Sequence, residues 1–401
     1  MNVLHIIRKK TQLKASFINN QIISHILYKP FVVFRFDKMK QHDGGFAEMK
    51  EGVVPSLNLA SRENKTSRFM FKLFKKIDKR MVGEIIRFTG QNNIRILHFH
   101  YGSDAGIYSP FLKMRTLPSV VSFYGYDCSG FPKRMLGLGE LWLRKRVFRY
   151  ADKVLAMSPD MKKDLLAAGC PEEKIIVHYY GTDVQKFRAI SREYGEKPVL
   201  TLLILCSLVP QKGHLFLLKS LTRLINDKEI PPFCLRIVGT GELEDELKTY
   251  TSQHGLSEAV LFIGAIPYGK EEMMFEYSNA DIFVHPSVTA TNGDKEGIPG
   301  AVVEAMASGL PVISTQHAGI PYILEHERTG LLVEEHDTEA LALAMKRLIA
   351  DVQLRQNLGE AARKYAFSNL DLKEKEKELE KMYDSVIKEW SYNHYNPTAL
   401  E

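Results

Sequence analysis

The sequence predicts two α/β domains, each a doubly wound parallel sheet of the Rossmann type, which face one another across a central cleft. Short β-rich runs alternate with helical patterns throughout the chain, as expected of βαβ units. At 401 residues, the chain is too long for one hydrophobic core and predicts two or three. The alternation breaks in the polar stretch SREYGEKP, Ser191–Pro198, and then restarts, so we expect the linker between the domains there.

The first half of the chain is predicted to contain strands separated by helices. Amphipathic segments predict helices such as Arg68–Arg87 and Leu138–Tyr150, and runs rich in Val, Ile and Phe predict the strands. The predicted strands are Val3–Ile7, Phe31–Phe36, Ile94–Phe99, Ser119–Phe123, Lys153–Ala156 and Lys174–His178.

The second half repeats this pattern and then becomes entirely helical. The last predicted helices are Thr338–Asp351, Gln353–Ala366 and a long charged one from Leu370 to about Trp390. In doubly wound sheets, ligands bind at the carboxyl ends of the strands. The predicted strands are Val199–Cys206, Cys234–Val238, Val260–Ile263, Ile282–His285, Val312–Ser314 and Leu331–Val333.

The composition is that of an ordinary globular protein, with 45% hydrophobic and 25% charged residues. The longest nearly apolar run, Pro198–Val209, is about half of the roughly 20 residues needed to cross a bilayer, so we expect neither a transmembrane span nor a signal peptide. The four cysteines are scattered without C-x-x-C spacing, which indicates neither a zinc site nor a disulfide framework. A reducing cytoplasm is therefore the expected location.

The formal charge of +6 hides an asymmetry between the two halves. Residues 1–190 hold 33 Lys and Arg against 16 Asp and Glu, a net charge of +17, whereas residues 191–401 have a net charge of −11. This asymmetry favours an anionic surface or substrate near the first half. No RNP or zinc-finger pattern accompanies the basic residues, so nucleic acid is not an expected partner.

One basic segment is suited to a membrane surface. The stretch SRFMFKLFKKIDKRM, from Ser67, interleaves Phe, Leu and Ile with Arg and Lys. A helix of this kind can lie on an anionic membrane. A helix that faces the core and has a solvated basic face explains the same pattern equally well.

Two carboxylates, Glu296 and Glu304, flank an apolar run in GDKEGIPGAVVEAMASGLPVIST, Gly293–Thr315. Val302–Ala307 is predicted to be a short helix, with Glu296 in the loop before it and Glu304 about one turn inside it. Carboxylates accept hydrogen bonds from hydroxyls, so one sugar ligand is suited to meet both. The plainer alternative is that Glu304 caps or solvates a helix and that Glu296 is an ordinary loop residue.

The backbone at the start of that helix is suited to an anion. The N–H groups of Gly300 and Ala301 are expected at a helix N-terminus, beside side chains small enough for a close approach. This arrangement suits a phosphate or diphosphate.

Two further motifs have competing interpretations. GTGEL resembles the start of a nicotinamide fingerprint, but Glu244 stands where the third glycine belongs, so a dehydrogenase is disfavoured. In HFHYG, His98 and His100 alternate along a strand and point to one face. They are suited to bind a metal, to pack in the core or to contact a substrate, and these interpretations remain open.

The segment PSVTATNGDKEGIPGAVVEAMASGLPVISTQHAGIPYILEHERTGLLVEEHD resembles the donor-binding region of glycosyltransferase family 4, retaining enzymes with the GT-B fold. Glu296 and Glu304 match the E-x7-E signature of that family. Near the start, SFINNQI is similar to the version found in exopolysaccharide and lipopolysaccharide sugar transferases. Further matches, spread along most of the chain, are HFHYG, ADKVLAMSPDMKKDLLAAGCPEEKI, HYYGTDVQKF, LVPQKG and IVGTGEL.

The resemblance implies the roles of the domains. Residues 1–190 would form the acceptor-binding domain and residues 191–370 the nucleotide-sugar donor-binding domain. The C-terminal helix, residues 371–401, would cross back to pack on the first domain.

The resemblance also implies a donor site in the second domain. Glu296 would contact the hydroxyls of the donor sugar, and Glu304 would hold the ribose diol. The amides of Gly300 and Ala301 would meet the diphosphate, to which Lys212 would supply positive charge.

Other positions match the family pattern or depart from it. Ile266, in GAIP, matches the position whose backbone touches the base. Ser207 stands where the family usually has an Arg, which removes one charge from the diphosphate site. Tyr124 stands where a His is common, and Tyr124 and His100 are expected to line the acceptor side of the cleft. Asp127 is retained.

The resemblance implies transfer without a metal or another cofactor. Breaking the bond from the anomeric carbon to phosphate makes the diphosphate more negative, so the site must stabilise the leaving group. No Asp-x-Asp triplet occupies the expected place, so Lys212 and the helix N-terminus would carry this charge. Front-face attack, in which the leaving phosphate deprotonates the acceptor hydroxyl, needs no protein nucleophile.

The implied function is a retaining glycosyltransferase of bacterial surface polysaccharide synthesis. It would move a sugar from a nucleotide sugar, with UDP-sugars expected first and GDP-mannose second, to a glycan or lipid-linked glycan acceptor. It would work in the cytoplasm or peripherally on the inner face of the plasma membrane. Ser207 and Tyr124 keep one alternative open, a catalytically silent GT-B protein that acts as a nucleotide-binding scaffold or partner subunit.

Overall fold

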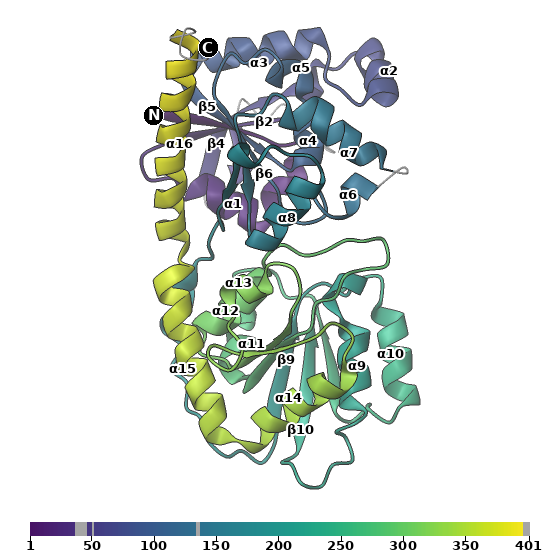
Figure 1. The fold of residues 1–401 in the computed structure, drawn as a ribbon. Helices are drawn as coiled ribbons and strands as arrows, with labels where there is room; N and C mark the ends of the chain where they lie inside the picture. Colours follow the sequence, from purple (N-terminus) through teal and green to yellow (C-terminus); the bar gives the residue numbers. More distant parts are fainter. Residues whose placement is uncertain (37–45, 50–51, 134–136, 396–401) are drawn as a thin grey trace. The chain divides into compact units, whose positions relative to one another are not determined.

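The computed structural model describes residues 1–36, 46–49, 52–133 and 137–395. The chain forms two compact units (Figure 1). Unit 1 contains Met1–Gly181 and the C-terminal segment that begins at Leu372, and unit 2 contains Thr182–Asp371. The sequence places the corresponding domain boundaries at residues 190 and 370.

Unit 1 is built on an eight-stranded sheet with the strand order β3-β4-β2-β1-β5-β6-β7-β8. The neighbouring strands are parallel, except that β3 runs antiparallel to β4. The sequence prediction missed β3 and β4 at this edge. The strands are β1 (Asn2–Ile6), β2 (Lys29–Phe34), β3 (Phe46–Met49), β4 (Gly52–Asn58), β5 (Ile94–His100), β6 (Ser119–Ser122), β7 (Lys153–Ala156) and β8 (Ile175–Val177).

The two helices predicted for unit 1 differ from those observed. Arg68–Arg87 is wrong as one helix, because Lys75 adopts a left-handed conformation (φ 50°) and Asp78 caps a new helix by accepting from the Met81 N–H group. Leu138–Tyr150 begins as an α-helix and continues as a π-helical turn over Arg144–Phe148. The helices are α1 (Ser16–Ile23), α2 (Lys65–Phe74), α3 (Lys79–Gln91), α4 (Gly102–Ala105), α5 (Ser109–Leu112), α6 (Gly130–Lys133), α7 (Leu138–Leu143) and α8 (Pro159–Ala167).

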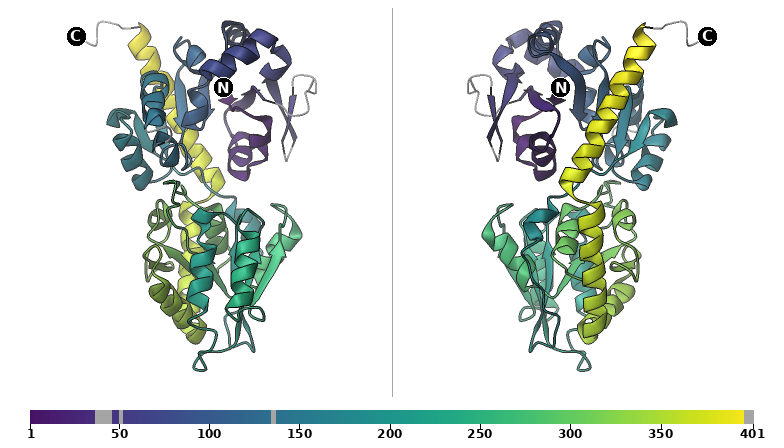
Figure 2. Two further views of the ribbon diagram at one scale, coloured as in Figure 1. Left: turned by 90° about the vertical axis from the view of Figure 1, so that its right-hand side faces the viewer. Right: turned by 90° about the vertical axis from the view of Figure 1, so that its left-hand side faces the viewer.

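The C-terminal helix α16 (Leu372–Tyr395) belongs to unit 1 and lies along its sheet (Figure 2). Leu379, Tyr383 and Val386 recur at helical spacing and are buried against Val3 of β1 and Ile96 of β5. The helix therefore closes one face of the central strands.

Unit 2 is built on a six-stranded parallel sheet with the order β11-β10-β9-β12-β13-β14. Helices cover it, and its core is formed by Leu, Ile and Val from the strands and from α9 and α14. The two Rossmann-like sheets predicted from the sequence are thus confirmed. The strands are β9 (Leu200–Leu205), β10 (Phe233–Val238), β11 (Val260–Gly264), β12 (Ile282–His285), β13 (Val312–Thr315) and β14 (Leu331–Val333). The helices are α9 (His214–Leu221), α10 (Glu244–Gln253), α11 (Glu271–Asn279), α12 (Gly300–Ala307), α13 (Ile320–Ile323), α14 (Thr338–Ala350) and α15 (Val352–Asn369).

The expected linker, residues 191–198, is anchored within unit 2. The Arg192 guanidinium donates to the carbonyl oxygens of Ala280 and Ser308, and the Tyr194 hydroxyl donates to that of Gly309. These side chains satisfy carbonyls where α11 and α12 end. The stretch is therefore a structural part of unit 2.

Among the described residues, none of the helices combines the length and the apolar character that crossing a membrane requires.

Candidate functional site

Glu296 is the centre of a polar cluster at the carboxyl ends of the strands of unit 2. Its carboxylate forms an ion pair with the Lys212 ammonium group and accepts a hydrogen bond from the Ser287 hydroxyl. His285 Nε2 lies 3.2 Å from Glu296 Oε2. The structure thus brings together Lys212 and Glu296, for which the resemblance implied contacts with the diphosphate and with the donor sugar, respectively.

A glycine allows this approach. Gly213 follows Lys212 with φ 69°, and a Cβ placed on it would lie 1.9 Å from the Pro286 carbonyl oxygen. A larger residue at this position would push the loop after β9 away from the loop after β12. Gly213 is therefore needed for Lys212 to reach Glu296.

The charges in this cluster are set by burial. Burial lowers the pKa of Lys212, partly offset by Cys206 and Asp294. Burial, and then the charge of Lys212, lowers the pKa of His285 well below its usual value, so the ring is neutral at pH 7. Facing a carboxylate, the neutral ring donates from Nε2 to Glu296. Glu296 therefore has one cation and two neutral donors as partners.

A second histidine ties neighbouring loops to this cluster. His317, after β13, accepts a hydrogen bond from the Glu296 N–H group at its Nε2, 3.2 Å away, and its Nδ1 lies 2.6 Å from Glu335 Oε1. Glu335, after β14, also accepts from the N–H and hydroxyl groups of Thr289. The contacts hold together the loops that follow β12, β13 and β14.

Sequence reasoning missed four residues of this cluster. A usable signal was present, because each lies at or just beyond the carboxyl end of a predicted strand, where ligand sites gather. The missed residues are His285, Ser287, His317 and Glu335.

Helix α12 places the two glutamates in different surroundings. Gly300 and Ala301 are half-buried in its first turn, and a Cβ on Gly300 would meet no atom within 4 Å. Glu304 is only 5% exposed and accepts a hydrogen bond of 2.8 Å from the Tyr277 hydroxyl. Glu304 thus lies buried beside Tyr277, whereas Glu296 is paired with Lys212.

Ser207 and Ile266 lie in separate loops of unit 2. Ser207 is exposed directly after β9. Ile266, after β11, borders an open hollow of about 470 Å³ together with Phe275 and Glu276 of α11. The described contacts join neither residue to Glu296.

The GTGEL motif has a structural explanation. A Cβ on Gly239 would lie 1.9 Å from the Cys206 carbonyl oxygen, and one on Gly241 would lie 2.3 Å from that of Leu208. The Leu208 N–H group donates to the Thr240 carbonyl at 3.0 Å. The glycines therefore let the loop after β10 lie against the backbone that leads to Lys212.

Tyr124 and His100 lie together at the carboxyl edge of unit 1. His100 Nδ1 is 2.6 Å from the Tyr124 hydroxyl oxygen, and the Tyr124 ring packs on Phe17 and Tyr101, with centroids 4.8 and 4.9 Å away. Burial raises the pKa of Tyr124 well above its usual value, so the phenol stays neutral. The result is a half-buried hydroxyl held by a buried imidazole.

Asp127 shapes the loop that carries Tyr124. Its carboxylate accepts hydrogen bonds from the N–H groups of Gly102, at 2.7 Å, and Tyr124, at 2.9 Å. Burial raises the pKa of Asp127 to about 6, and these backbone donors limit the rise. Asp127 therefore joins the loops after β5 and β6.

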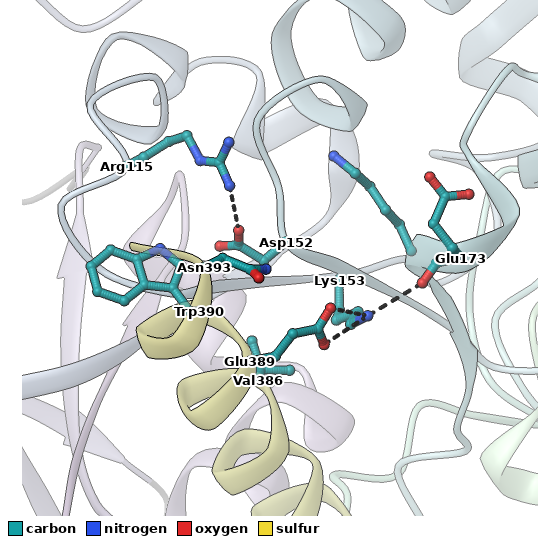
Figure 3. Close-up of a pocket in the computed structure, with 9 residues that line it drawn as sticks. Arg115, Asp152, Lys153, Glu173, Val386, Glu389, Trp390 and Asn393 are labelled. Carbon is teal, nitrogen blue, oxygen red and sulfur yellow. Dashed lines mark hydrogen bonds and ion pairs between the residues drawn. The ribbon is translucent and has the colours of Figure 1, made fainter. Parts of the chain in front are cut away.

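A further polar pocket of about 180 Å³ lies in unit 1 (Figure 3). It borders Lys153, at the amino end of β7, and the last turns of α16. Its charged groups pair with one another, Arg115 with Asp152 at 3.1 Å and Lys153 with Glu389 at 3.0 Å. Both pairs lie at the ends of the strands away from Tyr124, and the Lys153–Glu389 pair joins α16 to the sheet.

Two family models match consecutive parts of the chain. The model "Glycosyltransferase Family 4" matches residues 42–186, and "Glycosyl transferases group 1" matches residues 183–365. The second match contains Lys212, Glu296 and Glu304.

Curated relatives include sugar transferases of bacterial glycan synthesis. The amylovoran biosynthesis glycosyltransferase AmsK of Erwinia amylovora is 35% identical over 64% of this chain and 61% of its own length. A GDP-mannose-dependent phosphatidylinositol monomannoside mannosyltransferase of Mycolicibacterium smegmatis is 29% identical over 71% of this chain and 74% of its own length. The chain thus spans less than two thirds of AmsK.

Solved structures share the fold along nearly the whole chain. Anabaena Alr3699/HepE in complex with UDP has a TM-score of 0.74 at 17% identity, over 96% of this chain and 100% of its own. A glycosyltransferase from Rickettsia africae has a TM-score of 0.73 at 18% identity, over 96% of this chain and 98% of its own. These structures show the fold alone, which is the GT-B fold. The two consecutive model matches, which together span residues 42–365, show that the chain belongs to the glycosyltransferases described as group 1 and family 4.

Proposed function

We propose that the protein is a retaining glycosyltransferase that moves a sugar from a nucleotide sugar to a glycan acceptor in bacterial surface polysaccharide synthesis. The observation that carries the proposal is the pairing of Lys212 with Glu296 at the carboxyl ends of the strands of unit 2. The name of AmsK, an amylovoran biosynthesis glycosyltransferase, supports the polysaccharide acceptor.

In the proposed site, the ion pair exchanges its partners when the donor binds. Lys212 turns to the diphosphate and neutralises the charge that grows as the bond to the anomeric carbon breaks. Glu296 is then free to accept hydrogen bonds from sugar hydroxyls, while His285 and Ser287 hold its carboxylate in place. The amides of Gly300 and Ala301 meet the same diphosphate from the first turn of α12.

Glu304 is proposed to hold the ribose diol and Ile266 to contact the base. The Tyr277 hydroxyl donates to Glu304, so the carboxylate is already oriented before a ribose binds. Ile266 borders an open hollow of about 470 Å³ whose lining is suited to a flat ring. UDP-sugars are the preferred donors in this proposal, supported by the UDP complex of the HepE neighbour, and GDP-mannose is second, supported by the mannosyltransferase relative.

A thermal-shift panel with UDP-, GDP-, ADP- and CMP-sugars tests the donor. A ligand at about 100 times its Kd adds roughly 2.7 kcal/mol of stability, so one nucleotide is expected to stand out. Turnover of that sugar should persist in EDTA, because Lys212 and backbone amides supply the charge in place of a metal. A nucleotide that binds without turnover on any glycan acceptor would instead support a silent scaffold.

Peripheral membrane binding through α2 is proposed as the route to a lipid-linked acceptor. Phe69 and Leu73 are 65% and 64% exposed on this helix, and Lys72 and Lys75, within it and at its C-terminal end, are exposed as well. Apolar side chains within a basic surface suit the interface of an anionic bilayer. The net charge of +17 of residues 1–190 also supports this proposal.

Vesicle sedimentation tests this surface. The protein should bind vesicles rich in anionic lipid and not neutral ones, and a Phe69→Ser, Leu73→Ser variant should lose most of the binding. Leu343→Ser is the control, because Leu343 is 58% exposed on α14 of unit 2. Binding that is unchanged in the α2 variant would contradict the proposal.

A further inference from the structure

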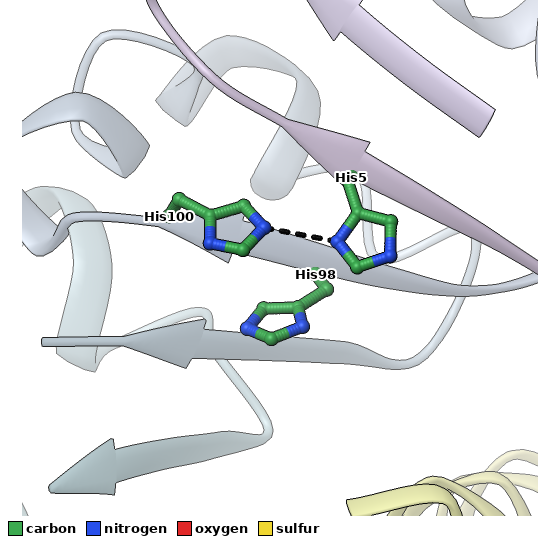
Figure 4. Close-up of side chains that lie close together, drawn as sticks. All are labelled: His5, His98 and His100. Atoms are coloured by element: carbon green, nitrogen blue, oxygen red, sulfur yellow. Dashed lines mark hydrogen bonds between the residues drawn. The ribbon is translucent and has the colours of Figure 1, made fainter. Parts of the chain in front are cut away.

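A row of hydrogen-bonded imidazoles lies inside unit 1, beneath Tyr124. His5 of β1 and His98 and His100 of β5 share the sheet face that α16 covers, because the β1–β5 register sets His5 opposite His98 (Figure 4). All three rings are fully buried. His25, just after α1, lies at the other end of the row, beside His5.

The ring nitrogens form a continuous chain to the Tyr124 hydroxyl. His25 Nε2 is 2.9 Å from His5 Nε2, and His5 Nδ1 is 2.9 Å from His100 Nε2. His100 Nδ1 is 2.6 Å from the Tyr124 oxygen, whose hydroxyl donates to Gln21 Oε1 at 3.3 Å. The chain thus runs from a buried histidine to a half-buried phenol at the carboxyl edge of the sheet.

Hydrogen bonds account for this cluster without a metal. His98, the ring outside the chain, has its Nδ1 2.5 Å from the Tyr383 hydroxyl and its Nε2 2.7 Å from Ser122 Oγ. Every ring nitrogen of His5, His25, His98 and His100 has a polar partner. A neutral imidazole has one donor and one acceptor nitrogen, so these contacts use both.

Carboxylates of α16 anchor the far end of the chain. Glu380 Oε1 accepts hydrogen bonds of 2.8–3.1 Å from the backbone N–H groups of residues 26–28, which only an acceptor oxygen can do. The same oxygen is 3.3 Å from His25 Nδ1, and Glu376 Oε1 is 2.6 Å from that nitrogen. His25 Nδ1 therefore carries a hydrogen.

His25 holds the positive charge in this row. Burial acts to lower the pKa of His25, but Glu376 and then Glu380 outweigh it and raise the pKa to about 9. Burial, and then the charge of His25, lowers the pKa of His100 to about 3. The titratable groups that face His25 are Glu376, Glu380 and Tyr383 of α16, Tyr28 before β2, and His5 of β1.

The charge on His25 sets the direction of every hydrogen bond in the chain. A His25 imidazolium donates from Nε2 to His5, so the proton of His5 lies on Nδ1 and points to His100. The proton of His100 then lies on Nδ1 and points to the Tyr124 oxygen, which leaves the Tyr124 hydroxyl to donate away from the chain.

Loss of one proton reverses the direction of every hydrogen bond from His25 to Tyr124. His25 keeps its hydrogen on Nδ1, because that nitrogen faces carboxylates, and its bare Nε2 accepts from His5. Each remaining proton shifts by one hydrogen bond, and the proton that is lost leaves from the Tyr124 end. The Tyr124 hydroxyl then points inward, to His100 Nδ1.

We propose that His25 is a positioning residue for Tyr124, because through His5 and His100 it holds the Tyr124 hydroxyl as a hydrogen-bond donor directed away from the imidazoles, toward Gln21 Oε1 in this structure. The direction of these hydrogen bonds depends on the His25 imidazolium, which the contacts of its Nδ1 with Glu376 and Glu380 support. The use of the Tyr124 hydroxyl, to donate to an oxygen of a bound glycan, rests on the proposed function.

The tautomers of His5 and His100 test the proposal directly. ¹⁵N NMR of histidine-labelled protein distinguishes Nδ1–H from Nε2–H rings. At pH 7 both rings should be Nδ1–H, and both should change to Nε2–H as the pH rises through about 9. A His100 ring that is Nε2–H at pH 7 would overturn the proposal.

Glu376→Gln sharpens this test. It removes the larger of the two attractions that hold the proton on His25, so the reversal should move down by about one pH unit or more. Glu378→Gln is the matched control, because Glu378 lies on the same helix but pairs with Lys375 at 3.0 Å. A reversal that stays at the same pH in Glu376→Gln would contradict the proposed coupling of His25 to Tyr124. If that variant does not fold, the tautomer titration of the unmodified protein decides.

Turnover measurements test the coupling of His25 to Tyr124 separately from the proposed function. With a glycan acceptor, the alkaline limb of kcat/KM should move in Glu376→Gln by the same amount as the tautomers. If the tautomers shift while the alkaline limb of kcat/KM stays fixed, the coupling of His25 to Tyr124 is upheld and the proposed contact of Tyr124 with the glycan is refuted.

Discussion

The two units gather polar side chains at the carboxyl ends of their strands, but they do so with opposite chemistry. In unit 2, a pair of opposite charges, Lys212 and Glu296, lies between loops with 16% and 10% of the two side chains exposed. In unit 1, buried imidazoles form a chain whose only strong charges, His25 with Glu376 and Glu380, lie under α16. The first arrangement can exchange its partners with a ligand, whereas the second can only pass on the direction of its hydrogen bonds.

Burial explains this difference. A charge that must meet an anionic ligand has to keep a path to solvent, and the loops after β9 and β12 provide it. An ion pair under a helix is costly to separate, because each partner would remain as an unpaired buried charge. We therefore expect substitutions in unit 2 to affect turnover first, and substitutions in unit 1 to affect stability and pH dependence.

The largest effect is expected for Lys212→Ala. The variant leaves the departing diphosphate without its cation, and the loss of one preorganised donor typically costs about 10²–10³ in kcat. Initial rates with the donor selected by thermal shift measure this. Lys219→Ala, on the exposed side of α9, is the control, and equal rates in both variants would rule out the proposed role of Lys212.

Glu380→Ala is expected to destabilise unit 1 by about 3 kcal/mol, because it leaves backbone donors of residues 26–28 without their acceptor and weakens the anchoring of His25. Both tryptophans of the chain, Trp142 and Trp390, lie in unit 1, so urea unfolding followed by their fluorescence reports on this unit. Glu378→Ala should change the free energy of unfolding by less than about 0.5 kcal/mol. A similar loss in both variants would argue against a special role for Glu380.

Alkaline pH should weaken unit 1 more than unit 2. His25 binds its proton more tightly in the folded state, with a pKa of about 9 against an ordinary value near 6.5. Its contribution to stability is therefore complete below about pH 6.5 and is lost as the pH rises through about 9. Tryptophan-detected unfolding between pH 6 and pH 10 measures this loss, which should be smaller in Glu376→Gln. A flat profile would contradict the assigned charge.

The smallest effect is expected for Ser207→Arg. The family usually has an Arg at this position, and Ser207 is exposed directly after β9. A guanidinium here should tighten UDP binding by about tenfold, because a charge-assisted hydrogen bond contributes roughly 1.5 kcal/mol. Calorimetric titration at low and high salt measures the gain, which should shrink with salt. Unchanged affinity would place Ser207 outside the diphosphate site.

The sequence predicted the sheets well where the strands are buried on both faces. Ile282–His285 and Leu331–Val333 have the bounds that the structure gives, because continuous apolar runs mark such strands. It missed β3, a four-residue strand at the edge of the sheet, and β4, which contains Gly52 and Pro55. It also joined α2 to α3, because periodicity alone does not reveal a left-handed Lys75.

For the candidate site, sequence motifs identified Lys212 and Glu296, which the structure places in contact. Two partners of Glu296 at the end of β12 and just after it, His285 and Ser287, were not identified, since a single side chain at a strand end carries no periodic signal. The sequence left the roles of His98 and His100 open, because their partners lie far along the chain.

The sequence by itself determined the two doubly wound sheets, the charge asymmetry and the glutamate pair of unit 2, because these depend on local patterns and on short spacings. Only the tertiary structure decided the contacts of the histidines of unit 1. His98 bonds Tyr383, 285 residues away, and Glu380 accepts from the backbone of Ile26, 354 residues away. No local pattern encodes contacts across such separations, since they form only when α16 packs on the sheet.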